Sequence, residues 1–311
     1  MMLRTQFTDL FLEDMLPALE TVIWNRYNRL PPQFTKIFNV KRSTKPIEQT
    51  TQLSGLGLFT QLSEAGSVRF DEPVQGFDKT YKHSRLGLGF RASSDLVEDD
   101  RFGLIAKMGV ELGRSAKETV EIDAASHFNY AFSGSYLGPD GVCLCSASHP
   151  LVKVGGVQSN VLSVAADLSV TSLQLALSQY RKMKDSSGKR IRVPVDKLVV
   201  HPDNEWKASE ILSGTKRSDT ANNTENAFRN RDEAYGSFSK WMVWDYLTDP
   251  DAWFLCASPE DTELRFYWRK EPYTVHDVDF DSQSVKTAMF YRCAHGWSDF
   301  YGVVGTPGAD A

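Results

Sequence analysis

The residues best suited to chemistry in this chain are four cysteines and six histidines. Cys143, Cys145 and His149 lie close together and could supply soft ligands to a zinc ion. Cys293 and His295 would then be remote partners. Zinc sites more often separate two cysteines by two residues. As alternate residues of a strand, Cys143 and Cys145 would face the same side, where they could also serve as small core residues. We therefore expect these cysteines in the core and predict no metal site.

A glycine pattern at residues 87–92 (GLGFRA) has the spacing of a dinucleotide-binding fingerprint, with alanine as its last member. That fingerprint requires a buried strand before it, which brings the phosphate to the start of the following helix. Residues 82–85 (KHSR) are polar, and no second apolar strand ends in an acid at the right distance. A dinucleotide-binding enzyme using Gly87, Gly89 and Ala92 stays an alternative, but a plain strand explains the pattern better.

Other catalytic signatures are missing from the sequence. There is no G-x-S-x-G elbow, no phosphate loop and no H-E-x-x-H motif. We predict that the chain is not an enzyme, with no catalytic residue and no cofactor.

The segment from Arg26 to Lys45 carries six basic residues and no acid, interleaved with aromatic residues. We interpret it as an arm with few local partners, which must lie on another subunit. Its candidate contact residues are Arg26, Arg29, Lys41 and Arg42. A nucleic-acid-binding module that contacts phosphates through the same arm is the second alternative.

Composition narrows the possible classes of protein. The chain has 311 residues, enough for one large or two medium domains, and 41% of them are hydrophobic. The net charge of −5 is weak evidence against a protein whose main task is to grip nucleic acid. No signal peptide and no apolar run of membrane-spanning length are recognisable, and four cysteines are too few for a disulfide scaffold.

The first element that positions these residues is the segment 53–92. Its apolar residues alternate as in a strand and do not recur with the period of a helix. Residues 55–58 (GLGL) and 86–90 (LGLGF) form two matched ends, so we predict a long hairpin over 53–92. A turn signal places its tip between Glu72 and Phe77. The candidate inter-subunit contacts at that tip are Glu72, Pro73, Gln75, Gly76 and Phe77.

The remaining pattern is mixed. An apolar stripe predicts one helix over 95–132, about 57 Å long and capped by Ser93 or Ser94. Further helices are predicted over residues 3–29, with a break at Pro17, and over 169–183 and 202–214. Strands at 197–200, 241–257 and 264–305 and a polar loop at 215–239 complete a pattern typical of an α+β fold.

From Arg114 onward, the sequence resembles the major capsid proteins of tailed phages. The closest likeness is to the Mu-like major head subunit family, which has the Hong Kong 97-type fold. The strongest stretch is YLTDPDAWFL at 246–255. The others, in the same order along the chain, are 113–119, 128–132, 140–146, 148–150, 155–160, 197–202, 211–212, 220–223, 296–299 and 305–308.

The resemblance implies five regions. They are an N-terminal arm (1–52), an extended hairpin loop (53–92), a peripheral domain with a spine helix (93–150), an axial domain (151–262) and return strands (263–311). It implies self-assembly into hexamers and pentamers of an icosahedral shell around double-stranded DNA. The expected partners are further copies of the chain, a scaffolding protein, a portal and a decoration protein, without a membrane. The expected location is the virion capsid, assembled in the cytoplasm of a host bacterium.

Overall fold

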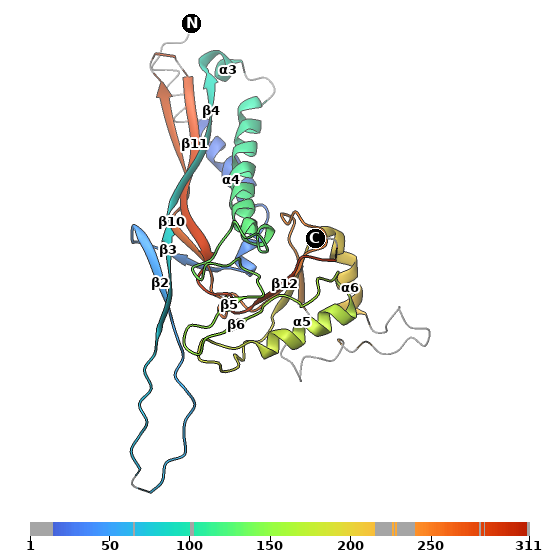
Figure 1. Cartoon of the computed structure of the whole chain (residues 1–311). Coiled ribbons are helices and arrows are strands. Elements are labelled where there is room, and N and C mark those ends of the chain that lie inside the picture. The colour runs from blue at the N-terminus through green and yellow to red at the C-terminus, as the bar shows by residue number, and fades with distance from the viewer. Residues whose placement is uncertain are drawn as a thin grey trace.

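A computed structural model describes residues 15–64, 66–99, 103–214, 226, 228, 240–279, 281–282 and 284–309. Figure 1 shows three parts: a long narrow part with strands beside a long helix, a broader domain to its side, and a loop that projects from the opposite end. From here on, the long narrow part is called the arm, as distinct from the N-terminal arm expected at residues 1–52. Two four-stranded sheets organise the arm and the side domain. No helix among the described residues is both long and apolar enough to cross a membrane.

The sheet of the long arm has the order β1-β10-β11-β4. Its centre is the antiparallel pair β10 (Leu264–Asp279) and β11 (Ser284–Trp297). The flanking strands are β1 (Asn39–Arg42), parallel to β10, and β4 (Ser84–Ser93), antiparallel to β11. Alternate residues of β11, such as Met289, Tyr291 and Cys293, are buried on the side that packs toward a helix. The opposite side of the sheet alternates charged residues such as Arg292 and Lys286 with apolar ones such as Phe290 and Ala288.

The helix against this sheet is α4 (Leu104–Asn129), about 39 Å long at about 1.5 Å per residue. The predicted apolar stripe is confirmed within it, but the prediction of one helix over 95–132 is wrong. The short helix α3 (Ser94–Glu98), capped by Ser93, is separate. Gly103 precedes α4 with φ of 62°, a left-handed conformation that interrupts a helix and suits glycine.

The N-terminal segment packs onto the same helix. Helix α2 (Leu16–Asn28) buries Leu19 and Ile23, and Pro17, the predicted break, lies in its first turn, where no N–H is required. Residues 1–14 of the predicted helix lie outside the described residues. A short helical turn η2 (Phe34–Lys36) then leads into β1. Phe34 and Phe38 are buried in the largest core cluster, so the expectation that residues 26–45 have few local partners is wrong.

The side domain has the sheet order β12-β9-β7-β8. Its strands are β7 (Lys197–Val200), β8 (Lys240–Val243), β9 (Trp253–Cys256) and β12 (Val303–Thr306). Its helices are α5 (Val170–Lys182), η3 (Pro202–Asn204) and α6 (Glu205–Ser213). The predictions of both helical regions and of the strand at 197–200 are confirmed. The predicted loop at 215–239 lies almost wholly outside the described residues.

The predicted hairpin over 53–92 is wrong in its pairing. Strand β2 (Ile47–Leu53) pairs with β3 (Gln75–Lys82), and the chain then turns at His83 into β4. Residues 86–90 therefore pair with β11 and not with residues 55–58. A small ladder of β5 (His149–Pro150) and β6 (Val157–Gln158) lies between the arm and the side domain. The predicted α+β class is confirmed.

The contact between α2 and α4 depends on a glycine. A methyl group at Gly113 would lie 2.5 Å from the carbonyl oxygen of Ile23. Gly113→Ala should therefore lower the free energy of unfolding by about 1–2 kcal/mol, because overpacking outweighs a helix-propensity gain of about 1 kcal/mol. Urea unfolding measures this change. Gly134→Ala is the matched control, since nothing lies within 4 Å of its new methyl group. Equal or greater stability of Gly113→Ala would contradict the packing.

Candidate functional site

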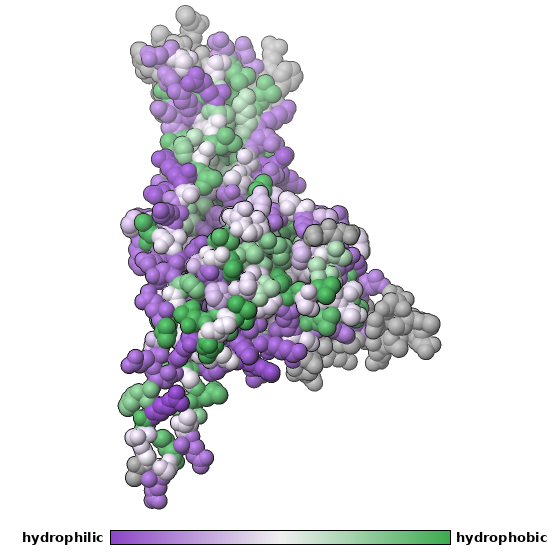
Figure 2. Space-filling view, in the orientation of Figure 1, coloured by the Kyte–Doolittle hydropathy of each residue, from purple (hydrophilic) through white to green (hydrophobic). Residues whose placement is uncertain are grey.

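The feature least explained by folding is the loop that joins β2 to β3, residues 54–64 and 66–74. It projects away from the body without regular secondary structure (Figure 1). Its apolar side chains are exposed; Phe59 is fully exposed and Phe70 is 91% exposed. The other exposed apolar residues there are Leu56, Leu58, Leu62, Val68 and Val74. Figure 2 shows hydrophobic residues along this projection with hydrophilic residues among them. Exposed apolar surface of this kind marks an interaction site.

The base of this projecting loop is fastened to the body. The backbones of Ser54 and Val74 pair across it. Lys153 donates from Nζ to Asp71 Oδ2 at 2.9 Å and to the carbonyl oxygen of Glu72 at 3.1 Å. Asp71 also accepts from the backbone N–H of Gly57 at 2.6 Å, and the hydrogen bond from Lys153 is the main cause that lowers its pKa. Only the distal part of the loop is therefore without contacts to the body.

A second fastening lies where β2 meets the last turn before β12. Gln52 donates from Nε2 to Asp299 Oδ2, and the backbone N–H of Phe300 donates to the same carboxylate. Burial, assisted by the charges of Glu263 and Asp140, raises the pKa of Asp299 to about 7, although the hydrogen bonds from Gln52 and Phe300 act against this shift. Gln52 Oε1 is buried with no hydrogen-bond donor. A proton on Asp299 would therefore find an acceptor beside it.

The side domain and the arm share the largest hydrophobic core cluster. Within it, one buried carboxylate, Glu121 in the middle of α4, binds groups from both parts. It accepts from the backbone N–H groups of Gln33 at 2.6 Å and Phe34 at 3.1 Å. Trp244, directly after β8, donates to it from Nε1 at 3.4 Å. Burial raises the pKa of Glu121, and these three donors oppose the shift. Sequence alone gives no signal for this acid, because its spacing is that of an ordinary helix position.

The chain matches a known protein family. The sequence model described as phage capsid protein matches residues 77–305, about three quarters of the chain. The chain belongs to the phage capsid protein family. No curated protein sequence matches it significantly. The predicted membership of the tailed-phage major capsid proteins is thus confirmed. The matched region begins inside β3 and contains both sheets except β1 and the last residue of β12.

Solved structures agree with this capsid protein in fold. The virus-like particle of Pyrococcus furiosus is 10% identical, with a TM-score of 0.54, over 93% of this chain and 98% of that chain. Mycobacterium phage Bobi is 13% identical, with a TM-score of 0.51, over 89% and 90%. The capsid of the native GTA particle is 10% identical, with a TM-score of 0.53, over 89% and 91%. At such identities the likeness establishes the fold, and the predicted Hong Kong 97-type fold is confirmed.

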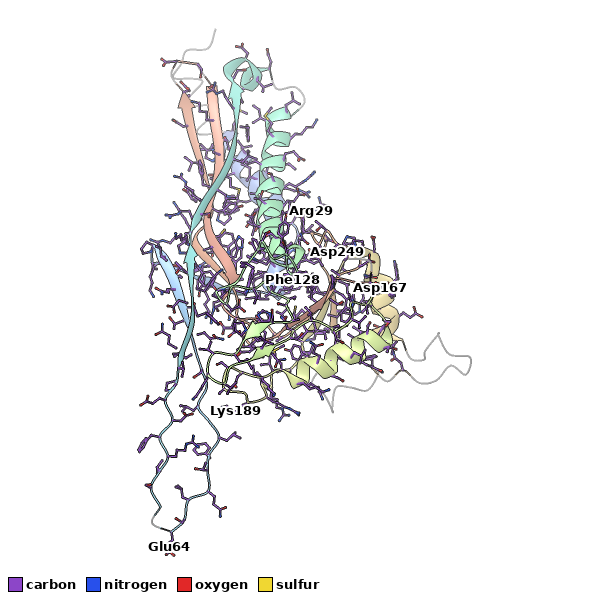
Figure 3. All side chains as sticks on the ribbon, viewed as in Figure 1. Arg29, Glu64, Phe128, Asp167, Lys189 and Asp249 are labelled. Atoms are coloured by element: carbon purple, nitrogen blue, oxygen red, sulfur yellow. The ribbon has the colours of Figure 1, made fainter. Side chains whose placement is uncertain are left out.

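The residues predicted to form the tip of the hairpin do not lie at the tip of the projecting loop. Glu72 and Pro73 lie at the exposed base of the loop, and Gln75, Gly76 and Phe77 begin β3, so their assignment to the tip is wrong. The turn at the far end is closed by Gly66 N–H donating to the carbonyl of Ser63, and Figure 3 shows Glu64 there. The proline and glycine signals mark the return to the strand. Contact of these five residues with another subunit stays a prediction.

The four basic candidates lie on α2 and β1. Arg26 is half-buried in the last turn of α2, and Arg29 follows it as an exposed residue (Figure 3). Lys41 is exposed, and the exposed Arg42 pairs with Glu271 at 2.7 Å. The aromatic residues between them are buried, so the nucleic-acid alternative lacks rings on which bases could stack. The role of these four residues in subunit contacts stays a prediction.

The cysteine and histidine residues take structural positions. Cys145 is in the core, and Cys143 Sγ donates to the carbonyl of Cys145. His149 contacts Asp140 at 2.6 Å and Asn160 at 3.1 Å through its two ring nitrogens. Within the described ranges, no three His, Cys, Asp or Glu side chains are grouped as a metal site would need.

The glycine pattern at 87–92 is explained by packing. Gly87 and Gly89 lie inside β4, where a methyl group on Gly87 would overlap the ring of Phe290 on β11. A dinucleotide fingerprint needs a turn between a strand and a helix, and residues 84–93 are one continuous antiparallel strand. The dinucleotide-binding alternative is therefore wrong.

Asp299 gives the capsid protein a testable pH dependence. Its pKa is higher folded than unfolded, so the folded state binds more protons, and stability should fall as pH rises from about 4 to about 7. Asp299→Asn should remove this part of the slope and stabilise the chain at pH 8, on the order of 2 kcal/mol. Urea unfolding between pH 4 and pH 8 measures both effects. Asp71→Asn is the control, because its pKa is shifted the opposite way. An unchanged slope in Asp299→Asn would refute the assignment.

Proposed function

We propose that this capsid protein is the major head subunit of a tailed phage or prophage. Its copies assemble into hexamers and pentamers, which build an icosahedral shell around double-stranded DNA. The observation that supports this best is the projecting loop, whose apolar side chains are left exposed by the parts of the chain that the structure describes. A family member with such a loop has a surface ready for a neighbouring subunit.

The energy of assembly comes from that surface. Burying the side chains of Phe59 and Phe70 on a neighbour would contribute on the order of 2 kcal/mol for each ring. In a closed ring every subunit both offers its loop and receives one, so each contact is repeated around the ring. Many modest contacts of this kind stabilise a shell without one dominant interface.

The shape of the subunit supports the same proposal. The arm and the projecting loop extend in opposite directions from the side domain (Figure 1). Such a subunit reaches neighbours at both ends and covers more shell surface than a round protein of equal mass. The fastened loop base fixes the direction in which the loop leaves the body, through Lys153 and Gln52.

The overall charge fits a container for DNA. With 40 acidic and 35 basic residues, the chain repels a duplex as a whole, so packaged DNA can slide in and out. The further partners we propose are a scaffolding protein, a portal and a decoration protein. We propose that assembly takes place in the cytoplasm of the host bacterium. The subunit acts as a structural protein without a cofactor.

The loop proposal predicts a defect confined to assembly. Phe59→Ser with Phe70→Ser should leave the fold intact and abolish closed particles, because both rings are already exposed within the chain. Negative-stain electron microscopy with light scattering on the purified full chain, against wild type, measures this. Both substitutions lie within the loop, because changes in β3 or β4 would also disturb the sheets to which these strands belong.

Leu175→Ser is the matched control, since Leu175 is 59% exposed on α5, away from the loop. It should assemble as wild type does. Normal shells from the double variant would contradict the role of the loop. A wild-type chain that stays monomeric even with its scaffolding protein would contradict the proposed function itself.

A further inference from the structure

Three positive charges lie side by side on the face of the long sheet turned away from α4, beside the part of that face that Tyr81 of β3 covers. Strand register pairs Arg292 of β11 with Arg85 of β4 on one side and with Lys270 of β10 on the other. The ladder between β10 and β11 shifts register just before and just after Lys270. We call these three residues the cation row. Like charges directly opposite each other on neighbouring strands are destabilising, so folding alone gives no reason for this arrangement.

The row has no carboxylate partner. No ion pair joins Lys270, Arg292 or Arg85 to an acid within the part of the chain that the structure describes. Two of the three lean on aromatic rings of the next row. Arg85 lies 4.7 Å from the ring centre of Phe290, and Lys270 lies 3.5 Å from that of Tyr273. These contacts hold the charges in place but leave them without a counterion.

A second row on the same face contains a cation that does have a carboxylate partner. Further along, Lys286 of β11 stands opposite Asp277 of β10 and forms an ion pair with Asp279. Arg91 of β4 stands on its other side. That row has mixed charge, and it provides a matched comparison on the same three strands.

Unused donors surround the cation row. Arg292 Nε is buried without a hydrogen-bond acceptor, and neither ring nitrogen of the neighbouring His83 has a partner. Burial lowers the pKa of His83, and the positive charges of Arg292 and Arg269 lower it further. The nearest acids are engaged: Glu48 accepts from Ser43 Oγ at 2.7 Å, and Glu271 pairs with Arg42. These atoms are buried within the chain, so a partner would contact the exposed Lys270 and Arg85.

We propose that the cation row is a docking surface for carboxylates of a second copy of this chain. The proposal rests on the proposed function, because it needs copies that associate. It names an electrostatic contact distinct from the apolar projecting loop.

The chain itself supplies the complementary charge. It has 40 acidic and 35 basic residues, so at least five carboxylates of each copy have no Lys or Arg of their own to pair with one to one. A DNA duplex fits less well. Its phosphates need cations spread along the backbone, whereas these three cross the sheet in one row with aromatic rings beside them. The net charge of −5 also opposes a duplex.

Carbodiimide coupling identifies the occupant directly, because it joins a carboxylate to a lysine amine only in close contact. Equal amounts of ¹⁴N- and ¹⁵N-labelled full-length chain are assembled together, coupled and digested. Mass spectrometry should find peptides of mixed label that contain Lys270 joined to an Asp or Glu peptide. Lys286 is the internal control, since its partner Asp279 belongs to the same chain and should give single-label peptides. Mixed-label links at other lysines without any at Lys270 would overturn the proposal.

A pair of variants measures the energy of the contact. Arg85→Gln with Arg292→Gln should raise the chain concentration needed for half-assembly about tenfold, and it should flatten the dependence of assembly on sodium chloride. Arg91→Gln, in the mixed row, should change neither. Unfolding in urea checks that both variants fold.

The outcomes separate the two proposals. If wild type assembles and the double variant assembles equally well, the docking surface is refuted and the proposed function stands. If wild type does not associate under any condition, both fail. Row-dependent retention of a DNA duplex, without mixed-label coupling at Lys270, would assign the cation row to nucleic acid instead.

Discussion

The two sheets share one hydrophobic core, and a buried carboxylate inside it must keep all its hydrogen-bond donors. Glu121 lies in the middle of α4 and accepts three N–H groups, two from residues 33–34 and one from Trp244. Burying a carboxylate is costly unless donors satisfy it, so loss of any donor leaves an unpaired group in the core. This requirement fixes the N-terminal segment, the helix and the side domain in one geometry. The directions of the arm and of the projecting loop follow from that geometry.

The molecule separates the surfaces that stabilise one chain from those available to a second. The body buries its aromatic residues around Phe128 at the foot of α4 (Figure 3), with Trp244 and Phe254 in contact. The projecting loop keeps its apolar side chains outside, and its base alone is fastened. On the sheet face turned away from α4, the three cations of the cation row likewise have no carboxylate partner among the described residues. A subunit with this division folds first and associates afterwards, since the associating groups are not needed for the core.

The sequence predicts what local chemistry determines. Ser169 caps α5 and Gly214 follows α6, and both signals lie within a few residues of the ends they mark. The hairpin pairing could not be predicted, because the partner of residues 86–90 is β11, about 200 residues further along the chain. Glu121 has the spacing of an ordinary helix position, and its donors come from distant segments. The loop was predicted as a projection, but its turn at Ser63–Gly66 was missed because proline and glycine nearer to β3 gave a stronger signal.

The strand order β1-β10-β11-β4 has a consequence for synthesis on the ribosome. The two outer strands lie within the first 93 residues, and the two central strands that must join them lie after residue 263. Neither β1 nor β4 has a sheet to pair with until almost the whole chain has emerged. An interrupted translation product therefore lacks the sheet of the arm, and α4 has nothing to cover. Because the sheet of the arm needs β10 and β11, only a chain synthesised through these strands can form the surface that its neighbours would contact.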